Sequence, residues 1–472
     1  MQPSEQFCDL GLIGLGTMGQ NLALNIAEHG FSLAIYNRTA EKTREFLATA
    51  AGRPIYAGYE LADFIRLLKK PRNILCLVAA GQAVDDLIAA LQPHLEPGDL
   101  VIDAGNSHFQ DTERRGQQLA AAGILFMGLG VSGGEAGARF GPSLMPGGPI
   151  EAYHRLQPLL EAVAARVGGE PCVAYLGQGA AGHYVKMVHN GIEYGLMQLL
   201  AETYDLMHHG LGLNHDTLHE VYSRWNREEL ASYLLAITAQ IMQQSDDRSG
   251  GRLLDKILDV AGAKGTGVWT SKEALELQVP IPTIDIAVSM RVLSGLKSER
   301  QIASQSLGGS LKQLAVAPEN FLPQLKHALL AGLIITFAQG MALLQAASRH
   351  YGYQLRLEQV AKIWRGGCII RAAILEDIRA AYGSDPELAN LLVAGNLRPT
   401  ILATQKNLRQ VVANAVLAGI PLPGLAASLS YFDAYRRARL PANLIQAQRD
   451  YFGAHMYERL DAPGHFHTHW QQ

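Results

Sequence analysis

Short apolar runs alternate with amphipathic segments along the first third of the chain. Five runs rich in Leu, Ile and Val predict buried strands, and segments such as 19–29 and 83–91 predict helices, because their apolar residues recur at helical spacing. Strands that alternate with helices are typical of βαβ units, so we expect a parallel sheet. The expected strands are residues 10–15, 33–36, 73–78, 100–103 and 124–127.

The pattern changes near residues 176–179, where two glycines end the alternation. From about residue 180 onward the strand pattern largely disappears and the helical period dominates. After Arg439 the chain becomes a polar tail rich in aromatic residues and His, which has little core of its own and either frays or docks on another surface. We predict an α/β domain over residues 1–179, a large all-α domain over 180–437 and a C-terminal tail over 438–472.

The helical part contains a weak internal repeat. Lys186 and Lys326 stand in similar segments, and Trp225 and Trp364 follow them at about the same distance, which is consistent with two similar halves. Residues 328–348 carry no charge and are about long enough to span a bilayer. Because this segment contains polar residues and has no second counterpart, we predict a helix buried within the helical domain and no membrane span.

The composition is that of a globular protein without a strongly charged surface. Of 472 residues, 48% are hydrophobic and 18% are charged, and the net charge is −3. Neither disorder nor binding to nucleic acid or an anionic membrane over the whole surface is expected. The four cysteines lie far apart and form no CxxC pair, which argues against a disulfide scaffold or a zinc knuckle. The N-terminus lacks the pattern of a signal peptide, so we expect a cytoplasmic protein.

The segment Gly14-Leu15-Gly16-Thr17-Met18-Gly19 follows the first expected strand and opens the first helix. In a dinucleotide-binding turn the first glycine permits the tight turn, the second lets backbone N–H groups approach a pyrophosphate, and the third lets helix pack on strand. A glycine turn without a ligand is the alternative, but the order of strand, glycines and helix favours a dinucleotide site. We therefore expect a Rossmann-like N-terminal domain.

Asn37-Arg38-Thr39 stands at the end of the second expected strand, the position that selects the cofactor. An NAD site usually places Asp or Glu here to bind the ribose 2′-hydroxyl, and a carboxylate would repel a 2′-phosphate. Arg38 pairs with such a phosphate and Thr39 adds a hydroxyl donor, although a surface Arg without a ligand is the alternative. We predict NADP as the cofactor.

Two further glycine-rich turns follow strands, Asp103-Ala104-Gly105-Asn106-Ser107 and Val131-Ser132-Gly133-Gly134. Ligands of open parallel sheets bind at the carboxyl ends of the strands, so Asn106 and Ser132 are expected where nicotinamide and substrate meet. Residues 142–148, which are rich in Pro and Gly, are expected to form another constrained loop.

The segment from Gly182 to Tyr194 carries the most varied set of polar side chains. Five of them recur at i, i+3, i+4, i+7 and i+8, which places them on one face of a helix, beside an apolar stripe that would anchor it. A solvated helix face is the alternative. Such faces usually repeat Glu, Lys and Arg, whereas this one has five different functional groups, which favours a site. The five are Lys186, His189, Asn190, Glu193 and Tyr194.

Several charged residues later in the chain suit a phosphate ligand, although each alone is more often a surface charge. Lys264-Gly265-Thr266-Gly267 offers a cation and a hydroxyl in a flexible loop. Arg291 follows on a helical stretch, and Arg449 and His455 stand in the tail. The alternating histidines at the end of the chain have no Cys or acid beside them, so no metal site is expected. These are His465, His467 and His469.

These motifs resemble those of the 6-phosphogluconate dehydrogenase family, and the resemblance runs from about Leu10 to Trp470. The runs around Lys186 and Arg449 are the most specific, because shorter β-hydroxyacid dehydrogenases share the N-terminal domain and a catalytic Lys but little of the last third. The resemblance rests on the glycine turn, Asn37-Arg38-Thr39, GVSGGEAGARFGPSLMPGG from Gly130, GHYVKMVHNGIEYG from Gly182, KGTG from Lys264 and LPANLIQAQRDYFGAH from Leu440.

The resemblance implies that 6-phosphogluconate is oxidatively decarboxylated with NADP, in the pentose phosphate pathway, by a homodimer whose tail reaches into the neighbour. It implies Lys186 as the general base and Glu193 as the general acid. The implied substrate residues are Asn106, Ser132, Gly133, Gly134, His189 and Asn190, with Tyr194, Lys264, Arg291, and Arg449 and His455 of the partner subunit at the 6-phosphate. The implied cofactor residues are Gly14, Leu15, Gly16, Thr17, Met18, Gly19, Asn37, Arg38, Thr39, Val78, Ala79, Ala80 and Asn106.

The sequence departs from the family's pattern without losing a residue assigned to catalysis. The family usually has Ala at Gly16, a change that a turn tolerates, and commonly has Lys at Ala79, so one NADP contact and part of the NADP preference are expected to be lost. Gly is usual at Ala104, Glu at Ala136, Asp at Leu196 and a basic residue at Val268. Two alternatives remain: a related β-hydroxyacid dehydrogenase for another phosphorylated sugar acid, and a non-catalytic NADP-binding protein.

Overall fold

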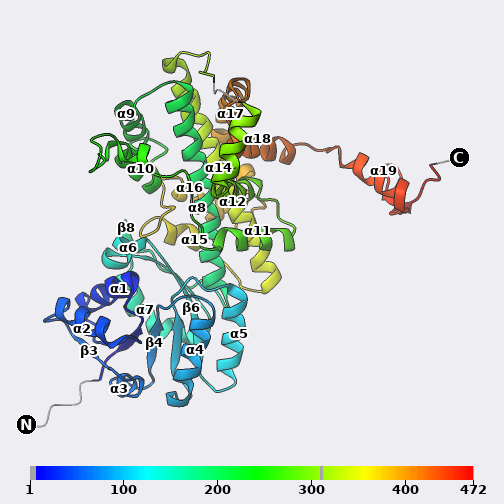
Figure 1. The fold of residues 1–472 in the computed structure, drawn as a ribbon. Helices are drawn as coiled ribbons and strands as arrows, with labels where there is room; N and C mark the ends of the chain where they lie inside the picture. The colour runs from blue at the N-terminus through cyan, green and yellow to red at the C-terminus, as the bar shows by residue number, and fades with distance from the viewer. Residues whose placement is uncertain (1–6, 309–311, 471–472) are drawn as a thin grey trace, which may run out of the picture.

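The computed structural model describes residues 7–308 and 312–470, and its first part is built on a seven-stranded sheet (Figure 1). The strands follow the order β3-β2-β1-β4-β5-β6-β7, and every neighbouring pair is parallel except β6 and β7. They are β1 (Leu10–Ile13), β2 (Leu33–Tyr36), β3 (Ile55–Ala57), β4 (Asn73–Cys76), β5 (Leu100–Asp103), β6 (Leu125–Ser132) and β7 (Ser143–Gly147).

The five predicted strands are confirmed, although 10–15 and 73–78 end two residues early, at Ile13 and Cys76. The edge strand β3 was not predicted, and the prediction is wrong at the opposite edge of the sheet. Residues 142–148, expected to be a loop, contain strand β7, which pairs antiparallel with β6 from Ser132↔Ser143 to Gly128↔Gly147. Its Pro and Gly residues hide the strand pattern, but an edge strand accepts proline. Strand β6 also runs on through Ser132, so the turn expected from residue 131 begins only at Gly133.

Helices cover both faces of the sheet and bury one hydrophobic cluster on each. Adjacent residues of a strand point to opposite faces, so Leu75 joins the cluster beneath α1 and α7, whereas Ile74 joins the cluster beneath α3 and α4. This is the Rossmann-like arrangement that the sequence predicted. The helices are α1 (Thr17–Glu28), α2 (Ala40–Thr49), α3 (Leu61–Arg66), α4 (Gln82–Leu91), α5 (Phe109–Ala120), α6 (Gly134–Phe140) and α7 (Ile150–Val163).

The rest of the chain is mostly helical and is organised around α8, which leads from the sheet into the helical body (Figure 1). The helices are α8 (Ala181–Asp205), α9 (His215–Trp225), α10 (Tyr233–Gln243), α11 (Thr266–Glu276), α12 (Pro282–Gly295), α13 (Lys297–Leu307), α14 (Pro318–Tyr351), α15 (Leu357–Trp364), α16 (Ile374–Ser384), α17 (Arg398–Ala418), α18 (Pro423–Tyr435) and α19 (Ala442–Gly453). Short strands also occur, β8 (Arg166–Val167) pairing with β9 (Glu170–Pro171) and β10 (Tyr457–Glu458) with β11 (His465–Phe466).

The long apolar helix α14 is a core element, as predicted for residues 328–348. It is long and apolar enough to cross a membrane by length and composition, yet 89% of its most apolar window is buried inside the protein. It packs against α8 and α17 at the centre of the helical body. Gly340 makes the approach to α8 close, because a Cβ there would lie 2.4 Å from a side-chain carbon of Ile192.

The C-terminal tail stands away from the body of the chain, with α19 beyond α18 (Figure 1). It folds on itself around Asp450, which is fully buried and accepts hydrogen bonds from the backbone of Met456 and Thr468 and from the indole of Trp470. The tail therefore has a small polar core, whereas the apolar side chains of α19 remain exposed. These are Leu444, Ile445, Tyr451 and Phe452.

Candidate active site

Two of the three glycines in the turn between β1 and α1 leave no room for a side chain, whereas the third faces open space. A Cβ on Gly14 would lie 2.4 Å from the carbonyl oxygen of Leu77, and a Cβ on Gly19 would lie 1.9 Å from that of Gly14, so neither position accepts a side chain. A Cβ built on Gly16 meets no atom within 4 Å. The backbone at Gly16 is therefore accessible to a phosphate at the N-terminus of α1.

The end of β2 is tied to this turn through Asn37. Its Oδ1 accepts a hydrogen bond from the backbone N–H of Leu15 at 3.0 Å, and its Nδ2 donates to the carbonyl of Thr39 at 3.1 Å. Asn37 thus shapes the turn, a role that the sequence did not separate from ligand binding. Arg38 is exposed beside it and is accessible to an anion. An open phosphate cradle next to a free guanidinium fits NADP.

The turns after β4 and β5 lie against the glycine turn. The Cβ position of Gly14 is 3.3 Å from Cγ1 of Val78, and that of Gly105 is 3.2 Å from the carbonyl oxygen of Val78. Ala79 and Asn106, which follow in these two turns, are exposed. The candidate cofactor residues therefore meet at the carboxyl ends of the strands, where ligands of open parallel sheets bind.

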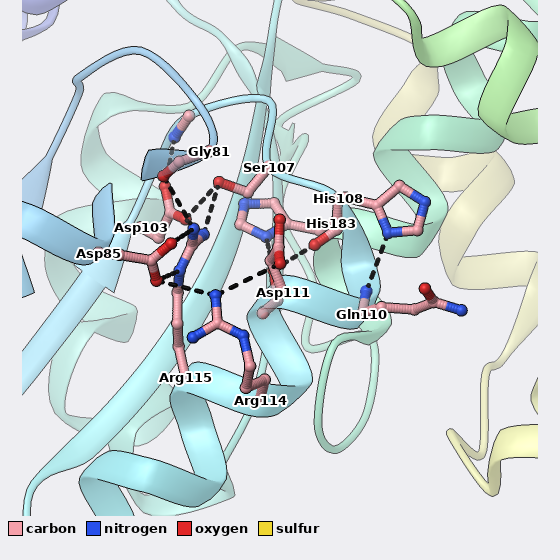
Figure 2. Close-up of polar contacts among 12 residues, drawn as sticks. Gly81, Asp85, Asp103, Ser107, His108, Gln110, Asp111, Arg114, Arg115 and His183 are labelled. Carbon is pink, nitrogen blue, oxygen red and sulfur yellow. Dashed lines mark hydrogen bonds and ion pairs between the residues drawn. The ribbon is translucent and has the colours of Figure 1, made fainter. Parts of the chain in front are cut away.

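A buried arginine that the sequence analysis did not single out holds two of these turns (Figure 2). Arg115 on α5 is 1% exposed, and its guanidinium donates to the carbonyl of Gly81 at 3.0 Å and to Asp85 Oδ1 at 2.8 Å. It also contacts Ser107 Oγ at 3.3 Å and Asp103 Oδ2 at 3.4 Å. Arg115 therefore fixes the turn after β4 relative to the turn that carries Asn106.

Helix α8 begins directly on the last two strands. A Cβ on Gly182 would lie 2.3 Å from the carbonyl oxygens of Gly128 and Met145, and a Cβ on Gly130 would lie 2.7 Å from Cβ of Lys186. No side chains separate the helix from the sheet at these points. Lys186 is thereby brought next to β6, the strand that ends at Ser132.

The polar face of α8 forms a connected set of contacts with the end of β6. Lys186 Nζ donates to Asn190 Oδ1 at 2.8 Å, and His189 Nδ1 lies 3.1 Å from the same oxygen. Since an amide oxygen only accepts, His189 carries its proton on Nδ1, and its Nε2 accepts from Ser132 Oγ at 3.3 Å. Glu193 Oε2 lies 3.9 Å from His189 Nδ1. The structure thus joins four of the five predicted α8 residues to Ser132.

Burial shifts the protonation of these groups toward their neutral forms. Lys186 is 8% exposed, and burial lowers the pKa of its ammonium below 10.5, although Glu193 and Cys368 act in the opposite direction. Burial raises the pKa of Glu193 above 4.5, with Lys186 and Arg291 acting in the opposite direction. Burial and the nearby Lys186 place the pKa of His189 well below 6.5. A lysine shifted toward its neutral amine and a glutamate shifted toward its protonated carboxyl, two turns apart on one face of α8, suit a general base and a general acid.

The fifth residue of the face, Tyr194, belongs to a cationic corner. The guanidinium carbon of Arg291 lies 3.4 Å above its ring, and a Cβ on Gly267 would lie 2.6 Å from a ring carbon, so the first turn of α11 packs flat against Tyr194. Lys264 is exposed just before that turn. The predicted phosphate residues of the helical body therefore converge, although more than 60 residues separate Tyr194 from the loop.

A loop that sequence reasoning missed covers the other side of the site. Gly366-Gly367-Cys368 follows α15, and the carbonyl oxygen of Gly367 accepts from the backbone N–H of Ser143 at 2.8 Å and would lie 2.5 Å from a Cβ on Gly133. Burial raises the pKa of Cys368 to about 12, so a neutral thiol faces Lys186. The adjacent glycines before the cysteine were the available indication of a close approach.

The tail residues are the exception to this convergence. Arg449 and His455 are exposed, and α19 lies apart from α8 of its own chain (Figure 1). Arg449 Nη1 donates to Gln446 Oε1 at 3.1 Å, within the tail. Of the terminal histidines, His467 lies 2.9 Å from Asp450 Oδ1, so it serves the core of the tail.

Comparison with known proteins gives one family over almost the whole chain. Residues 9–177 match the NAD binding domain of 6-phosphogluconate dehydrogenase, and residues 182–470 match the 6-phosphogluconate dehydrogenase C-terminal domain. The decarboxylating 6-phosphogluconate dehydrogenase of Synechococcus elongatus is 55% identical, over 98% of both chains. The NADP(+)-dependent, decarboxylating enzyme of Bacillus subtilis is 51% identical, over 98% of this chain and 99% of its own.

A solved structure has the same fold over its full length. The Plasmodium falciparum 6-phosphogluconate dehydrogenase, studied in its apo form and in complexes with its cofactor NADP+ and its substrate 6-phosphogluconate, superimposes with a TM-score of 0.95. It is 44% identical and covers 98% of this chain and 100% of its own.

Proposed function

The chain belongs to the 6-phosphogluconate dehydrogenase family, and from this premise we propose that it oxidatively decarboxylates 6-phosphogluconate to ribulose 5-phosphate and CO2 with reduction of NADP. The observation that carries the proposal is the polar face of α8. A buried lysine and a largely buried glutamate lie on that face, between a dinucleotide cradle and a cationic corner. This arrangement has a separate group for each step that the reaction needs.

Lys186 is the general base of the oxidation. Bound NADP supplies the acceptor for the hydride that leaves C3 of the sugar acid. Because burial favours its neutral form, the Lys186 amine takes the proton of the 3-hydroxyl as the C3–H bond breaks, and a 3-keto acid results. The amide oxygen of Asn190, 2.8 Å from Nζ, orients the amine and accepts a hydrogen bond from the ammonium that forms.

During decarboxylation Lys186 acts in the opposite sense, and Glu193 joins it. A ketone β to the carboxylate takes up the electron pair of the breaking C1–C2 bond, so CO2 leaves as an enolate forms. Lys186, now protonated, donates to the enolate oxygen, and an enol forms. Glu193 then delivers a proton to the carbon that lost CO2, while the enol hydroxyl returns its proton to Lys186, which leaves the ketone of ribulose 5-phosphate. The raised pKa of Glu193 favours the protonated carboxyl that this step needs.

The substrate is held at both of its ends. Ser132, Gly133, Gly134, His189, Asn190 and Asn106 bind the sugar acid, while Tyr194, Lys264 and Arg291 bind the 6-phosphate. The contact of Arg291 with the Tyr194 ring supports this assignment, because it orients a guanidinium whose Nη1 also donates to the carbonyl of Gly262, two residues before the exposed Lys264. Binding energy from a phosphate far from C3 helps to position the reacting carbons.

The tail completes the phosphate site of a second copy in a homodimer. Arg449 and His455 of the partner subunit join Lys264 and Arg291. Four exposed apolar side chains on α19 support this part of the proposal, because an apolar helix face on an extended arm is suited to burial against another surface.

Residues 1–179 form the NADP domain, 180–437 the substrate and dimerisation domain of two similar halves, and 438–472 the tail. The enzyme acts in the cytoplasm, in the pentose phosphate pathway and in gluconate utilisation.

The function is tested by NADPH formation with 6-phosphogluconate in the presence of a chelator, with NADP and NAD in parallel. Turnover that favours NADP is expected. Comparable turnover with both cofactors would still support the proposed reaction. It would attribute the weak cofactor preference to Ala79, where the family commonly has Lys. A folded protein that binds NADP without turnover would contradict the proposal, and turnover only with another phosphorylated sugar acid would replace the substrate.

Replacing Arg38 by Gln is expected to raise the KM for NADP by at least about tenfold and to leave the KM for NAD within about twofold, since only NADP carries the phosphate that a charge-assisted hydrogen bond would hold. The matched control is Arg44→Gln, which removes an exposed arginine paired with Glu41 on the next helix. Equal changes for the two cofactors would place the 2′-phosphate elsewhere.

The pH profile of kcat/KM is expected to be bell-shaped. The pKa values that define its two limbs should be shifted toward neutrality from the ordinary values of lysine and glutamate. Activity rises with pH as Lys186 loses its proton, below the ordinary lysine pKa, and falls as Glu193 loses its proton, above the ordinary glutamate pKa. Steady-state rates over about pH 5 to 10 measure both limbs. In Glu193→Gln the residual activity should keep the acid limb and lose the alkaline limb; an unchanged alkaline limb would assign it to another group.

A further inference from the structure

Two histidines and one aspartate gather at the opposite end of α8 from Lys186. They are His208 in the π-helical turn Leu206–Gly210 that follows α8, His215 at the first position of α9, and Asp255 in the short 3-10 turn Leu253–Lys256. One ligand atom of each residue lies within 4.8 Å of the other two. Three separate segments of the chain thus bring metal-binding atoms together away from the dehydrogenase site.

The His208 ring is already held in the form that binds a metal. Its Nδ1 lies 2.9 Å from the carbonyl oxygen of Leu213, and because a carbonyl only accepts, the proton is on Nδ1. Nε2 therefore carries a free lone pair. The Tyr204 ring stacks on the imidazole, with 5.3 Å between centroids and 15° between planes. A backbone carbonyl on the far nitrogen is a common support for a histidine that ligates a metal.

His215 has a buried nitrogen that the protein leaves without a hydrogen bond. Its residue is 7% exposed, and Nε2 is buried and makes no hydrogen bond with the residues that the structure describes. The same atom lies 3.3 Å from Asp255 Oδ1. Buried polar atoms in native structures nearly always have a partner, so an imidazole nitrogen without a hydrogen bond, 3.3 Å from a carboxylate oxygen, is positioned to share a cation with that carboxylate. The Asp255 side chain is 46% exposed, which gives an ion access from solvent.

We propose that His208, His215 and Asp255 bind one divalent transition metal ion of the zinc type, with water as the fourth ligand. Two imidazoles and a carboxylate suit Zn²⁺, whose bonds of about 2.0–2.2 Å in a tetrahedron put ligand atoms roughly 3.3 Å apart. The distance from His215 Nε2 to Asp255 Oδ1 already has that value. All three ligand atoms lie within 4.8 Å of one another, so small side-chain movements are enough to bring them to that spacing.

The ion would have a structural role, because it would connect two segments of the chain. Residues 255–264 are exposed, and this segment leads from Asp255 to Lys264, the lysine of the cationic corner. A bond from Asp255 to two histidines at the end of α8 and the start of α9 would tie the beginning of that segment to the helical core. Such a site stabilises the fold by binding the native state more tightly than the unfolded chain.

The test is Zn²⁺ titration of the full chain after removal of metals with a chelator, followed by calorimetry, and a parallel titration with Co²⁺ followed by its visible absorption. One ion per chain and the strong bands of four-coordinate Co²⁺ are expected. Asp255→Asn and His208→Gln should weaken Zn²⁺ binding by more than about 100-fold, because the loss of a mere supporting partner already costs roughly 10–100-fold. Zn²⁺ should raise the Tm of the unmodified chain and not that of Asp255→Asn.

Two controls separate this site from other histidines. His209→Gln should retain binding, because its Nδ1 contacts Asp205 at 2.6 Å and it lies outside the cluster. His469→Gln, which removes a histidine of the tail, should also retain binding. The proposal is overturned if the unmodified chain binds no Zn²⁺, or if Asp255→Asn and His208→Gln bind it as tightly as the unmodified chain. Since binding is read without turnover, the result is independent of the dehydrogenase assay.

Discussion

Replacement of Lys186 by Met is expected to lower kcat by about 10²–10⁴-fold while the affinity for NADP stays within about twofold. Methionine fills much of the same buried volume next to β6 but has no amine, so neither the 3-hydroxyl nor the enolate oxygen meets a proton-transfer group. The dinucleotide cradle around Gly16 is formed by other residues and remains intact. Steady-state rates with saturating substrate and calorimetric titration with NADP measure the two quantities.

The internal repeat of the sequence provides the matched control, Lys326→Met. Lys326, on α14, contacts Glu228 and Glu229, which follow α9, and both carboxylates are partly exposed. Its loss should leave kcat within about twofold, because weakly buried ion pairs contribute little. If Lys186→Met retained a rate within tenfold of the unmodified enzyme, another group would have to be the base.

The strands and the first helices were predictable because each is encoded locally. The five expected strands are continuous runs of Leu, Ile and Val, and a strand buried on both faces needs no other pattern. Strand β7 was not predictable in this way, since Ser143–Gly147 begins after Pro142 and contains Pro146 and Gly147. Its formation depends on pairing with β6, which no local pattern reports.

The residues of the candidate site likewise fall into those that the local sequence predicts and those that depend on contacts between distant segments. The face of α8 followed from helical spacing alone, because residues three and four apart are neighbours on any helix. The role of Arg115, the packing of Gly267 against Tyr194 and the approach of Gly367 to Gly133 depend on contacts between distant segments. The sequence supplied the residue types for these contacts but not the partners.

The tail is the part of the chain whose proposed role requires a second copy. Arg449 is in the most specific family run of the last third, yet α19 stands apart from α8 of its own chain (Figure 1). Phe452 is 72% exposed and Leu444 is 61% exposed on the same helix. An arm with an apolar face and a conformation fixed around Asp450 is built to contact something else, and we have proposed a second copy.

Two variants that are each defective should restore activity when they share a dimer. Arg449→Ala is expected to raise the KM for 6-phosphogluconate by at least about 100-fold, since a charged hydrogen-bond partner of the phosphate is lost, and to leave NADP binding nearly unchanged. Lys186→Met is inactive for a different reason. Both chains are co-expressed with different tags, the mixed dimer is purified through both, and NADPH formation is measured at low substrate concentration.

The outcome depends on which chain supplies Arg449 to a site. If the tail acts across the subunit boundary, one site of the mixed dimer combines an intact Lys186 with Arg449 of the partner subunit, and the other site has neither. About half of the unmodified activity should then return in the purified mixed dimer. If the tail serves its own chain, each site lacks one of the two groups and the mixed dimer stays as inactive as its parents. A mixed dimer with no regained activity would therefore remove Arg449 from the partner's phosphate site.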